Sequence, residues 1–299
     1  MSDRPILITG GSGQVAQALF TLAARNDVAA KLVGRPDFDF DDPTTVEGCL
    51  DAIRPWLVVN AAAYTGVDAA ESDADAADRA NHQGPARLAA LCARTGTKLI
   101  HISTDYVFDG LKGAPYVEED ATAPTGVYGA TKLAGERAVL AAGGENLVLR
   151  TSWVYSATGR NFVRSMLNAA QKTGRLRVVA DQVGCPTSAA DLASTILNLA
   201  GQLREGGWHD SHGGIFHAAG TGFTTWHGLA EAVFEEAVRH GRPAPEVEPI
   251  ATADWPTPAA RPPDSRLDCS RLARIFGQSL PPWRSGLSRT IAVMMAGAG

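Results

Sequence analysis

The stretch that most limits the fold of this chain is a short apolar run followed by a glycine loop and a helical pattern. Pro5–Thr9 is rich in strand-forming residues, and Gly10–Ala16 follows it directly. Apolar side chains then recur at helical spacing as far as Ala23. A strand, a glycine turn and a helix in this order are the context that a dinucleotide-binding fingerprint requires. The start of the chain therefore predicts a Rossmann-like nucleotide-binding unit.

The small residues of this loop have separate expected roles. Gly10 would make the tight turn. Gly13 would let a pyrophosphate approach the backbone at the helix N-terminus, where free N–H groups and the helix dipole favour an anion. Ala16 stands where a third glycine is often found and is small enough for close helix–strand packing. We therefore expect a dinucleotide cofactor at this loop.

The residues after the second predicted strand bear on which dinucleotide binds. Lys31–Val33 ends in Gly34-Arg35, where the fingerprint usually has an acidic residue. A guanidinium at that place suits a ribose 2′-phosphate, which favours NADPH over NADH. Four aspartates follow, and two alternatives stay open: a carboxylate such as Asp39 lies near the adenosine, or the acidic cluster is a solvated loop. The predicted cofactor is NADPH, with NADH as the alternative.

The rest of the first half alternates buried strands with helices. The predicted strands are Leu57–Ala63, Lys98–Thr104 and Asn146–Trp153, and Ala80–Arg94 is helical by pattern. This alternation predicts a parallel sheet. The hydroxyls of Ser103 and Thr104 would then lie at the C-terminal end of a central strand, where open α/β sheets carry their chemistry.

The pattern of elements changes after Trp153. Further elements are predicted at 161–173 (helix), 176–181 (strand), 189–203 (helix), 214–219 (strand), 226–239 (helix), 270–276 (helix) and 286–295 (helix), with an irregular, proline-rich loop at 242–263. The predicted fold is α/β: a Rossmann-like doubly wound parallel sheet with a smaller, mostly C-terminal α/β substrate domain. We expect the dinucleotide-binding domain at 1–153 plus about 175–220, and the substrate domain at about 154–174 plus 221–299.

A tyrosine and a lysine four residues apart form the expected reaction centre. Tyr128 and Lys132 would share one face of a helix, one turn from each other. A free tyrosine has a pKa of about 10, and a neighbouring ammonium favours the phenolate and lowers that pKa. Such a pair is a general acid for a carbonyl, or a general base for an alcohol. By spacing alone, a solvated helix face is the alternative explanation.

Composition argues against several other classes of protein. The 299 residues suffice for one large domain or two moderate ones, and 45% of them are hydrophobic. A net charge of -5 argues against a nucleic-acid partner and a polybasic membrane contact. The apolar runs are too short to span a bilayer, and the N-terminus lacks a signal-peptide core. Four scattered cysteines fit reduced thiols in a cytoplasm.

Three features line up: the glycine fingerprint, a hydroxyl at the end of the fourth strand, and the Tyr-x-x-x-Lys helix. Together they resemble the short-chain dehydrogenase/reductase superfamily, in its extended branch that acts on nucleotide sugars. Within that branch the chain is similar to the dTDP-4-dehydrorhamnose reductases, from Ile6 to about Met295. The closer likeness is carried by Asn60–Thr65, Val67-Asp68, Glu71-Ser72, Ser103–Phe108, Val127–Gly129, Arg150–Tyr155, Asp181-Gln182, Pro186-Thr187, Arg261-Pro262 and Ser265–Leu267.

The resemblance implies roles for individual residues. Tyr128 would be the proton donor, Lys132 would bind the nicotinamide ribose and tune Tyr128, and Thr104 would lie beside the substrate oxygen. The implied cofactor contacts are Gly13, Gln14 and Val15 at the pyrophosphate, Asp39 and Phe40 near the adenine, Ala63, Tyr64 and Thr65 on the far side, and Ala62 beside them. The implied substrate contacts are Asp105 and Trp153. The substrate pyrophosphate needs cations, for which Arg261 and Arg266 are candidates, although either could be an ordinary surface arginine.

The implied reaction is NAD(P)H-dependent reduction of the C4 ketone of dTDP-4-dehydro-L-rhamnose to dTDP-L-rhamnose, the last step of dTDP-L-rhamnose synthesis. One alternative is a nucleotide-sugar epimerase or dehydratase, which shows no net oxidation. Dehydratases usually have an acidic pair after the threonine of the fourth strand, whereas Thr104 is followed here by Asp105-Tyr106. The other alternative is a non-catalytic binding subunit similar to the regulatory subunit of methionine adenosyltransferase. Stoichiometric loss of NADPH would separate the three.

One departure from the resembled family concerns metal. Some members bridge a dimer through magnesium held by glutamates, and the aligned positions here are Ala18, Ala190 and Val293. None of these side chains offers the oxygen ligands that a hard cation needs. We therefore expect no metal, and a monomer or weak homodimer that takes a small-molecule dTDP-sugar in the cytoplasm.

Overall fold

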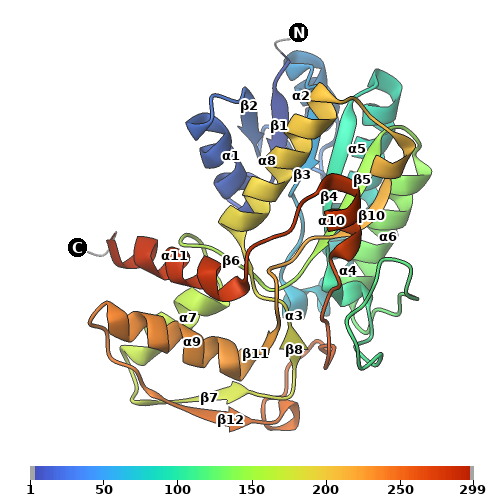
Figure 1. Ribbon diagram of the computed structural model, residues 1–299. Coiled ribbons are helices and arrows are strands. Elements are labelled where there is room, and N and C mark those ends of the chain that lie inside the picture. The colour runs from blue at the N-terminus through green and yellow to red at the C-terminus, as the bar shows by residue number, and fades with distance from the viewer. Residues whose placement is uncertain (1–3, 297–299) are drawn as a thin grey trace.

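The structure is a computed structural model that describes residues 4–296. Figure 1 shows a large sheet with helices on both faces and, below it in the view, a smaller part that carries the C-terminal helix. The outermost residues of the expected domains, 1–3 and 297–299, lie outside the described residues.

The large sheet has six strands, which all pair in parallel. They are β1 (Ile6–Thr9), β2 (Ala30–Val33), β3 (Leu57–Asn60), β4 (Lys98–Thr104), β5 (Asn146–Thr151) and β10 (Gly214–His217). Their order in space is β10-β5-β4-β3-β1-β2, so the direction of winding reverses between β1 and β3. Open α/β sheets bind ligands at such a switch point, outside the carboxyl ends of the strands.

Two layers of helices cover this sheet because its strands are apolar on both sides. One layer consists of α1 (Gln14–Arg25), α8 (Ala189–Glu205) and α10 (Ser270–Phe276), and the other of α2 (Pro43–Ile53), α5 (Gly84–Thr95) and α6 (Val127–Ala141). Ile6 and Ile8 of β1 point into the first layer, and Leu7 points into the second. The predicted Rossmann-like, doubly wound fold is confirmed.

The smaller part is organised around a two-stranded sheet of β7 (Arg175–Val179) and β12 (Glu246–Ile250). Its helices are α7 (Phe162–Ala170), α9 (Trp226–Arg239) and α11 (Trp283–Ala296), which share one apolar cluster. Two short pairs connect it to the large sheet: β6 (Val154–Tyr155) with β9 (Thr187–Ser188), and β8 (Val183–Gly184) with β11 (Thr224–Thr225). Short helical segments complete the chain: α3 (Val67–Ala70), α4 (Ala74–Asp78), the π-helical η1 (Arg79–Gln83), and the 3₁₀ turns η2 (Asp105–Val107), η3 (Asp210–His212) and η4 (Thr252–Asp254).

The structure differs from the sequence expectations in three places. The segment 242–263 is not wholly irregular, because β12 lies within it; Pro249 is tolerated there since β12 has a single partner strand. The helix expected at 80–94 begins as a π-helical turn and becomes α-helical at Gly84. Two segments also lie across the expected domain boundary: β7 pairs with β12, and α10 packs against the large sheet. The exact division into domains stays a prediction.

Candidate active site at the carboxyl edge of the sheet

The loop between β1 and α1 accepts only glycine at its turn. Gly10 has φ +106°, and a Cβ there would lie 2.8 Å from the Ala61 carbonyl oxygen. α1 begins at Gln14, and its N-cap, Gly13, offers no side chain to bond the first N–H groups. The Val15 side chain packs against the core, and its backbone N–H lies in the first turn of α1, where the helix itself supplies no acceptor. The loop therefore fits the pyrophosphate of a dinucleotide.

The residues expected at the adenosine form one charged cluster. The Arg35 guanidinium meets Asp39 at 3.0 Å and Asp41 at 2.9 Å, and its side chain stays 67% exposed. Arg79 also pairs with Asp41, at 2.7 Å. The cation suited to a 2′-phosphate and the carboxylates suited to a 2′-hydroxyl therefore lie side by side. Phe40 is anchored nearby, since a Cβ at position 84 would lie 2.2 Å from its ring.

The segment after β3, with Ala62, Ala63, Tyr64 and Thr65, is held by a residue that sequence reasoning missed. Asn81 of η1 accepts from the Tyr64 N–H at 2.8 Å and donates to the Tyr64 carbonyl at 3.1 Å. Its amide also donates to Thr131 of α6 at 3.2 Å. Asn81 thus ties the expected cofactor-lining segment to the helix that carries Tyr128 and Lys132.

The three expected catalytic residues come together where β4 meets α6. Thr104 is the last residue of β4, and Tyr128 lies in the first turn of α6 with its side chain half-buried. The Thr104 hydroxyl lies beside the Tyr128 phenol and lowers its pKa. Lys132 is one turn further on and 2% exposed, and its Nζ donates to the Ile102 carbonyl at 2.7 Å.

Burial controls the charge states of this group. It raises the pKa of Tyr128 to about 12, with the Asp105 carboxylate adding to the shift and the Thr104 hydrogen bond opposing it. It lowers the pKa of Lys132 to about 8, against the pull of the Glu136 carboxylate. The expectation that Lys132 gives Tyr128 a lowered pKa is therefore wrong for the protein without bound cofactor or substrate. Desolvation raises this pKa instead, and the Lys132 ammonium is directed at the Ile102 carbonyl.

Asp105 is buried and bonded on both oxygens. Thr104 donates to Oδ1 at 3.1 Å, Ser152 donates to Oδ2 at 2.9 Å, and Ser265 is a third partner. Burial raises the pKa of Asp105 to about 6, although these three hydroxyls oppose the rise. The carboxyl is thus fixed beside Thr104, at the place where an oxygen-bearing substrate would meet the expected catalytic group.

The remaining expected substrate contacts lie on the side of the smaller part. Trp153 follows β5 with a left-handed backbone, φ +47°, and its ring stacks on another indole, that of Trp226. Arg261 pairs with Asp68 at 2.8 Å and lies beside Tyr106, whose ring meets the Tyr128 ring edge-on at 5.6 Å. This contact brings Arg261 near the catalytic group.

Arg266 has partners of its own. It pairs with Asp264 at 2.6 Å, and its guanidinium lies 4.8 Å from the centre of the Phe223 ring. Each candidate arginine is therefore already paired with a carboxylate, which an incoming pyrophosphate would have to displace or share.

A buried ion pair between β5 and α6 supports the reaction centre, and sequence reasoning missed it as well. Arg150 of β5 donates to both oxygens of Glu136, at 2.8 and 2.7 Å. Ser103 donates to the same carboxylate at 2.5 Å. Glu136 lies one turn after Lys132 on α6, so the pair fixes the helix and opposes the depression of the Lys132 pKa. No local sequence pattern marks such a contact between a strand and a helix.

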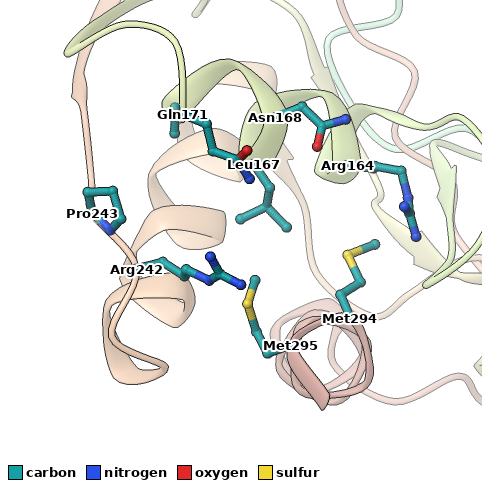
Figure 2. Close-up of a pocket in the computed structure, with 9 residues that line it drawn as sticks. Arg164, Leu167, Asn168, Gln171, Arg242, Pro243, Met294 and Met295 are labelled. Atoms are coloured by element: carbon teal, nitrogen blue, oxygen red, sulfur yellow. The ribbon is translucent and has the colours of Figure 1, made fainter. Parts of the chain in front are cut away.

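A cavity of about 160 Å³ lies elsewhere, between α7, α11 and the segment before β12 (Figure 2). Its walls are formed by Arg164, Leu167, Asn168, Ala170, Gln171, Arg242, Pro243, Met294 and Met295. None of the expected site residues is among them. This cavity is therefore separate from the candidate active site.

The described residues also bear on the binding of metal ions and of membranes. Within residues 4–296, no group of three or more His, Cys, Asp or Glu side chains is placed to hold a metal ion. Ala190 and Val293 are exposed, and Ala18 is half-buried. The absence of a bridging metal stays a prediction.

Among the described helices, none is long and apolar enough to cross a bilayer.

The chain is similar to known proteins over nearly its whole length. A family model described as the RmlD substrate binding domain matches residues 4–296. A dTDP-4-dehydrorhamnose reductase of Sinorhizobium fredii is 43% identical, with 97% of each chain covered, and one of Burkholderia thailandensis is 43% identical, with 93% of this chain and 95% of the relative covered. The crystal structure of a dTDP-4-dehydrorhamnose reductase from Bacillus anthracis in complex with NADP has a TM-score of 0.89 at 33% identity, and 97% of this chain and 99% of that chain are covered. The resemblance inferred from the sequence is confirmed: the chain belongs to the RmlD substrate binding domain family, together with these dTDP-4-dehydrorhamnose reductases.

Proposed function

We propose that this chain reduces the C4 ketone of dTDP-4-dehydro-L-rhamnose to dTDP-L-rhamnose with NADPH. The observation that carries the proposal is the placing of Thr104, Tyr128 and Lys132 at one end of β4, with the Thr104 hydroxyl close enough to the Tyr128 phenol to lower its pKa. Relatives that are 43% identical over 97% of the chain are named for this activity, which supports the same substrate here.

The cofactor site fits NADPH. Gly10, Gly13 and the first N–H groups of α1 would receive its pyrophosphate, and Arg35 is placed to meet a 2′-phosphate once its bonds to the aspartates are shared. When bound, NADPH supplies the hydride that reduces the ketone carbon. The relative from Bacillus anthracis that holds NADP supports this choice, and NADH is the alternative.

The chain's own residues would handle the proton. With a pKa of about 12, Tyr128 keeps its proton through the neutral range and can give it to the developing alkoxide. Thr104 would hydrogen-bond the same substrate oxygen. Lys132, with a pKa of about 8, is mostly charged at pH 7 and would stabilise the phenolate left behind. A positioned acid of this kind typically accelerates a reaction by about 10²- to 10⁴-fold.

The sugar nucleotide would lie between the two parts of the chain. Asp105 and Trp153 are the proposed contacts to the sugar, and Arg261 and Arg266 the proposed partners of its pyrophosphate.

A cytoplasmic location and a monomer or weak homodimer belong to the same proposal. The high pKa of the buried thiols Cys92 (about 12) and Cys185 (about 11) fits the reduced cysteines expected there.

A screen of nucleotide-linked ketosugars that follows NADPH absorbance tests this function. The proposal expects rapid loss of NADPH with dTDP-4-dehydro-L-rhamnose. Conversion without net loss of NADPH would indicate an epimerase or dehydratase. Binding without any conversion would indicate a non-catalytic subunit.

A further inference from the structure

Both faces of the Trp153 ring are covered. On one side the rings of Trp153 and Trp226 are parallel to within 8°, with centroids 3.5 Å apart. On the other side lies Gly184, where a Cβ would be 2.4 Å from Cε2 of the Trp153 ring and 2.7 Å from both Cζ2 and Nε1. Those three distances place it above the ring plane. A ligand can therefore meet only the edge of this indole.

The backbone of Trp153 does not hold the ring in place by itself. Its φ of +47° is unfavourable for a bulky side chain, so the surroundings must maintain it. The Trp153 carbonyl accepts from the Thr187 N–H at 3.2 Å, which fixes one side of the peptide. The side-chain torsion angles of Trp153 are therefore fixed by the residues that pack on the two faces of its ring.

Trp226 is itself fixed by polar contacts. It is the first residue of α9, and its indole N–H donates to Gln182 Oε1 at 3.2 Å. Gln182 donates in turn to the Thr252 hydroxyl at 3.0 Å, and Thr252 is bonded to Asp181. A chain of contacts thus runs from the loop before Arg261 to the ring of Trp153.

We infer that Trp226 is a positioning residue for substrate: it holds the Trp153 indole edge-on to the sugar nucleotide and couples it to the segment that begins at Thr252. This inference rests on the proposed function, since Trp153 is a proposed contact to the sugar. In this proposal Trp226 does not contact the cofactor. Loss of the Trp226 ring should therefore weaken binding of the sugar nucleotide and leave binding of NADPH unchanged.

The test compares Michaelis constants for dTDP-4-dehydro-L-rhamnose and for NADPH. Trp226→Leu is expected to raise KM for the sugar nucleotide about five- to tenfold, the effect of losing one aromatic stack, and to leave KM for NADPH unchanged. Trp226→Phe retains an aromatic face and should restore most of the affinity. Phe162→Leu is the matched control, because Phe162 packs on Trp226 at 4.7 Å but is not the ring stacked on Trp153.

Two outcomes would overturn the inference. One is a folded Trp226→Leu variant with wild-type KM for the sugar nucleotide. The other is an equal rise in the Phe162→Leu control, which would reduce Trp226 to ordinary packing. If Trp226→Leu does not fold, Gly184→Ala disturbs the same ring from its other face, and an unchanged KM there overturns the inference too. Failure of the proposed function shows in the wild type, whereas failure of the positioning role shows only in the variants.

Discussion

The hydroxyl of Thr104, the last residue of β4, lies beside the phenol of Tyr128 in the first turn of α6 and lowers the pKa of that phenol. Burial outweighs this effect and raises the pKa of Tyr128 to about 12. It therefore remains protonated at neutral pH, next to a hydroxyl that can bind the same substrate oxygen. The pair forms an acid that already holds the proton it would donate.

Removing that proton should abolish most catalysis. Tyr128→Phe keeps the ring packing, including the edge contact with Tyr106, but lacks the acid. We expect kcat to fall by at least about 10²-fold, with NADPH binding nearly unchanged. Tyr106→Phe is the control, since its hydroxyl meets Arg261 and not Thr104. Steady-state kinetics and cofactor titration measure both, and wild-type turnover by Tyr128→Phe would rule out this acid.

Lys132 should make stability depend on pH. Its pKa is about 8 in the folded chain, below its ordinary value of 10.5, because burial disfavours the ammonium. Between these two values the unfolded chain binds more protons than the folded chain. The contribution of Lys132 to the free energy of unfolding therefore rises with pH across that window.

Urea unfolding at several pH values across the window measures this contribution. Lys132→Met should remove the rise. Lys98→Met should retain it, because the Lys98 ammonium is paired with Glu145 at 2.5 Å and lies apart from the reaction centre. The same pH dependence in wild type and Lys132→Met would contradict the depressed pKa.

Arg35 should set the preference between the two cofactors. A charge-assisted bond to a 2′-phosphate is lost in Arg35→Ala, so kcat/KM for NADPH should fall by about tenfold while that for NADH changes little. Asp39→Asn is the companion variant, which frees the guanidinium from one carboxylate and should favour NADPH further. An equal loss for both cofactors, or a wild type that prefers NADH, would show that Arg35 does not bind the phosphate.

Chelation should leave the enzyme unchanged. Ala18, Ala190 and Val293 are the positions at which the sequence resemblance led us to look for a bridging metal, and none of the three side chains offers an oxygen ligand. Activity and sedimentation are expected to be the same before and after exhaustive treatment with EDTA. A drop in either that magnesium restores would disprove this prediction.

The fold could be predicted where the pattern is local. The glycine loop before α1 and the Tyr128–Lys132 spacing are each contained in a few residues, so period and turn chemistry suffice to identify them. β12 was missed because it lies in a proline-rich stretch and itself contains Pro249, and because its partner strand lies some seventy residues earlier.

The supporting contacts of the site could not be predicted. Asn81, Ser152, Ser265 and the Glu136–Arg150 pair act through partners that are distant in sequence, and no residue spacing reveals them. The charge state of Tyr128 was also missed, since it depends on how far the phenol is desolvated and on where the Lys132 amine is directed. The ion pair between Arg35 and Asp39 could not be predicted either, because it depends on the path of the loop.

The most direct test of the account is the stoichiometry of the reaction in purified wild-type protein. dTDP-4-dehydro-L-rhamnose is mixed with NADPH, NADPH loss is followed by absorbance, and the sugar nucleotide formed is identified by chromatography and NMR. The account predicts one NADPH oxidised for each dTDP-L-rhamnose formed. Formation of a different sugar nucleotide, or conversion with no net loss of NADPH, would contradict it.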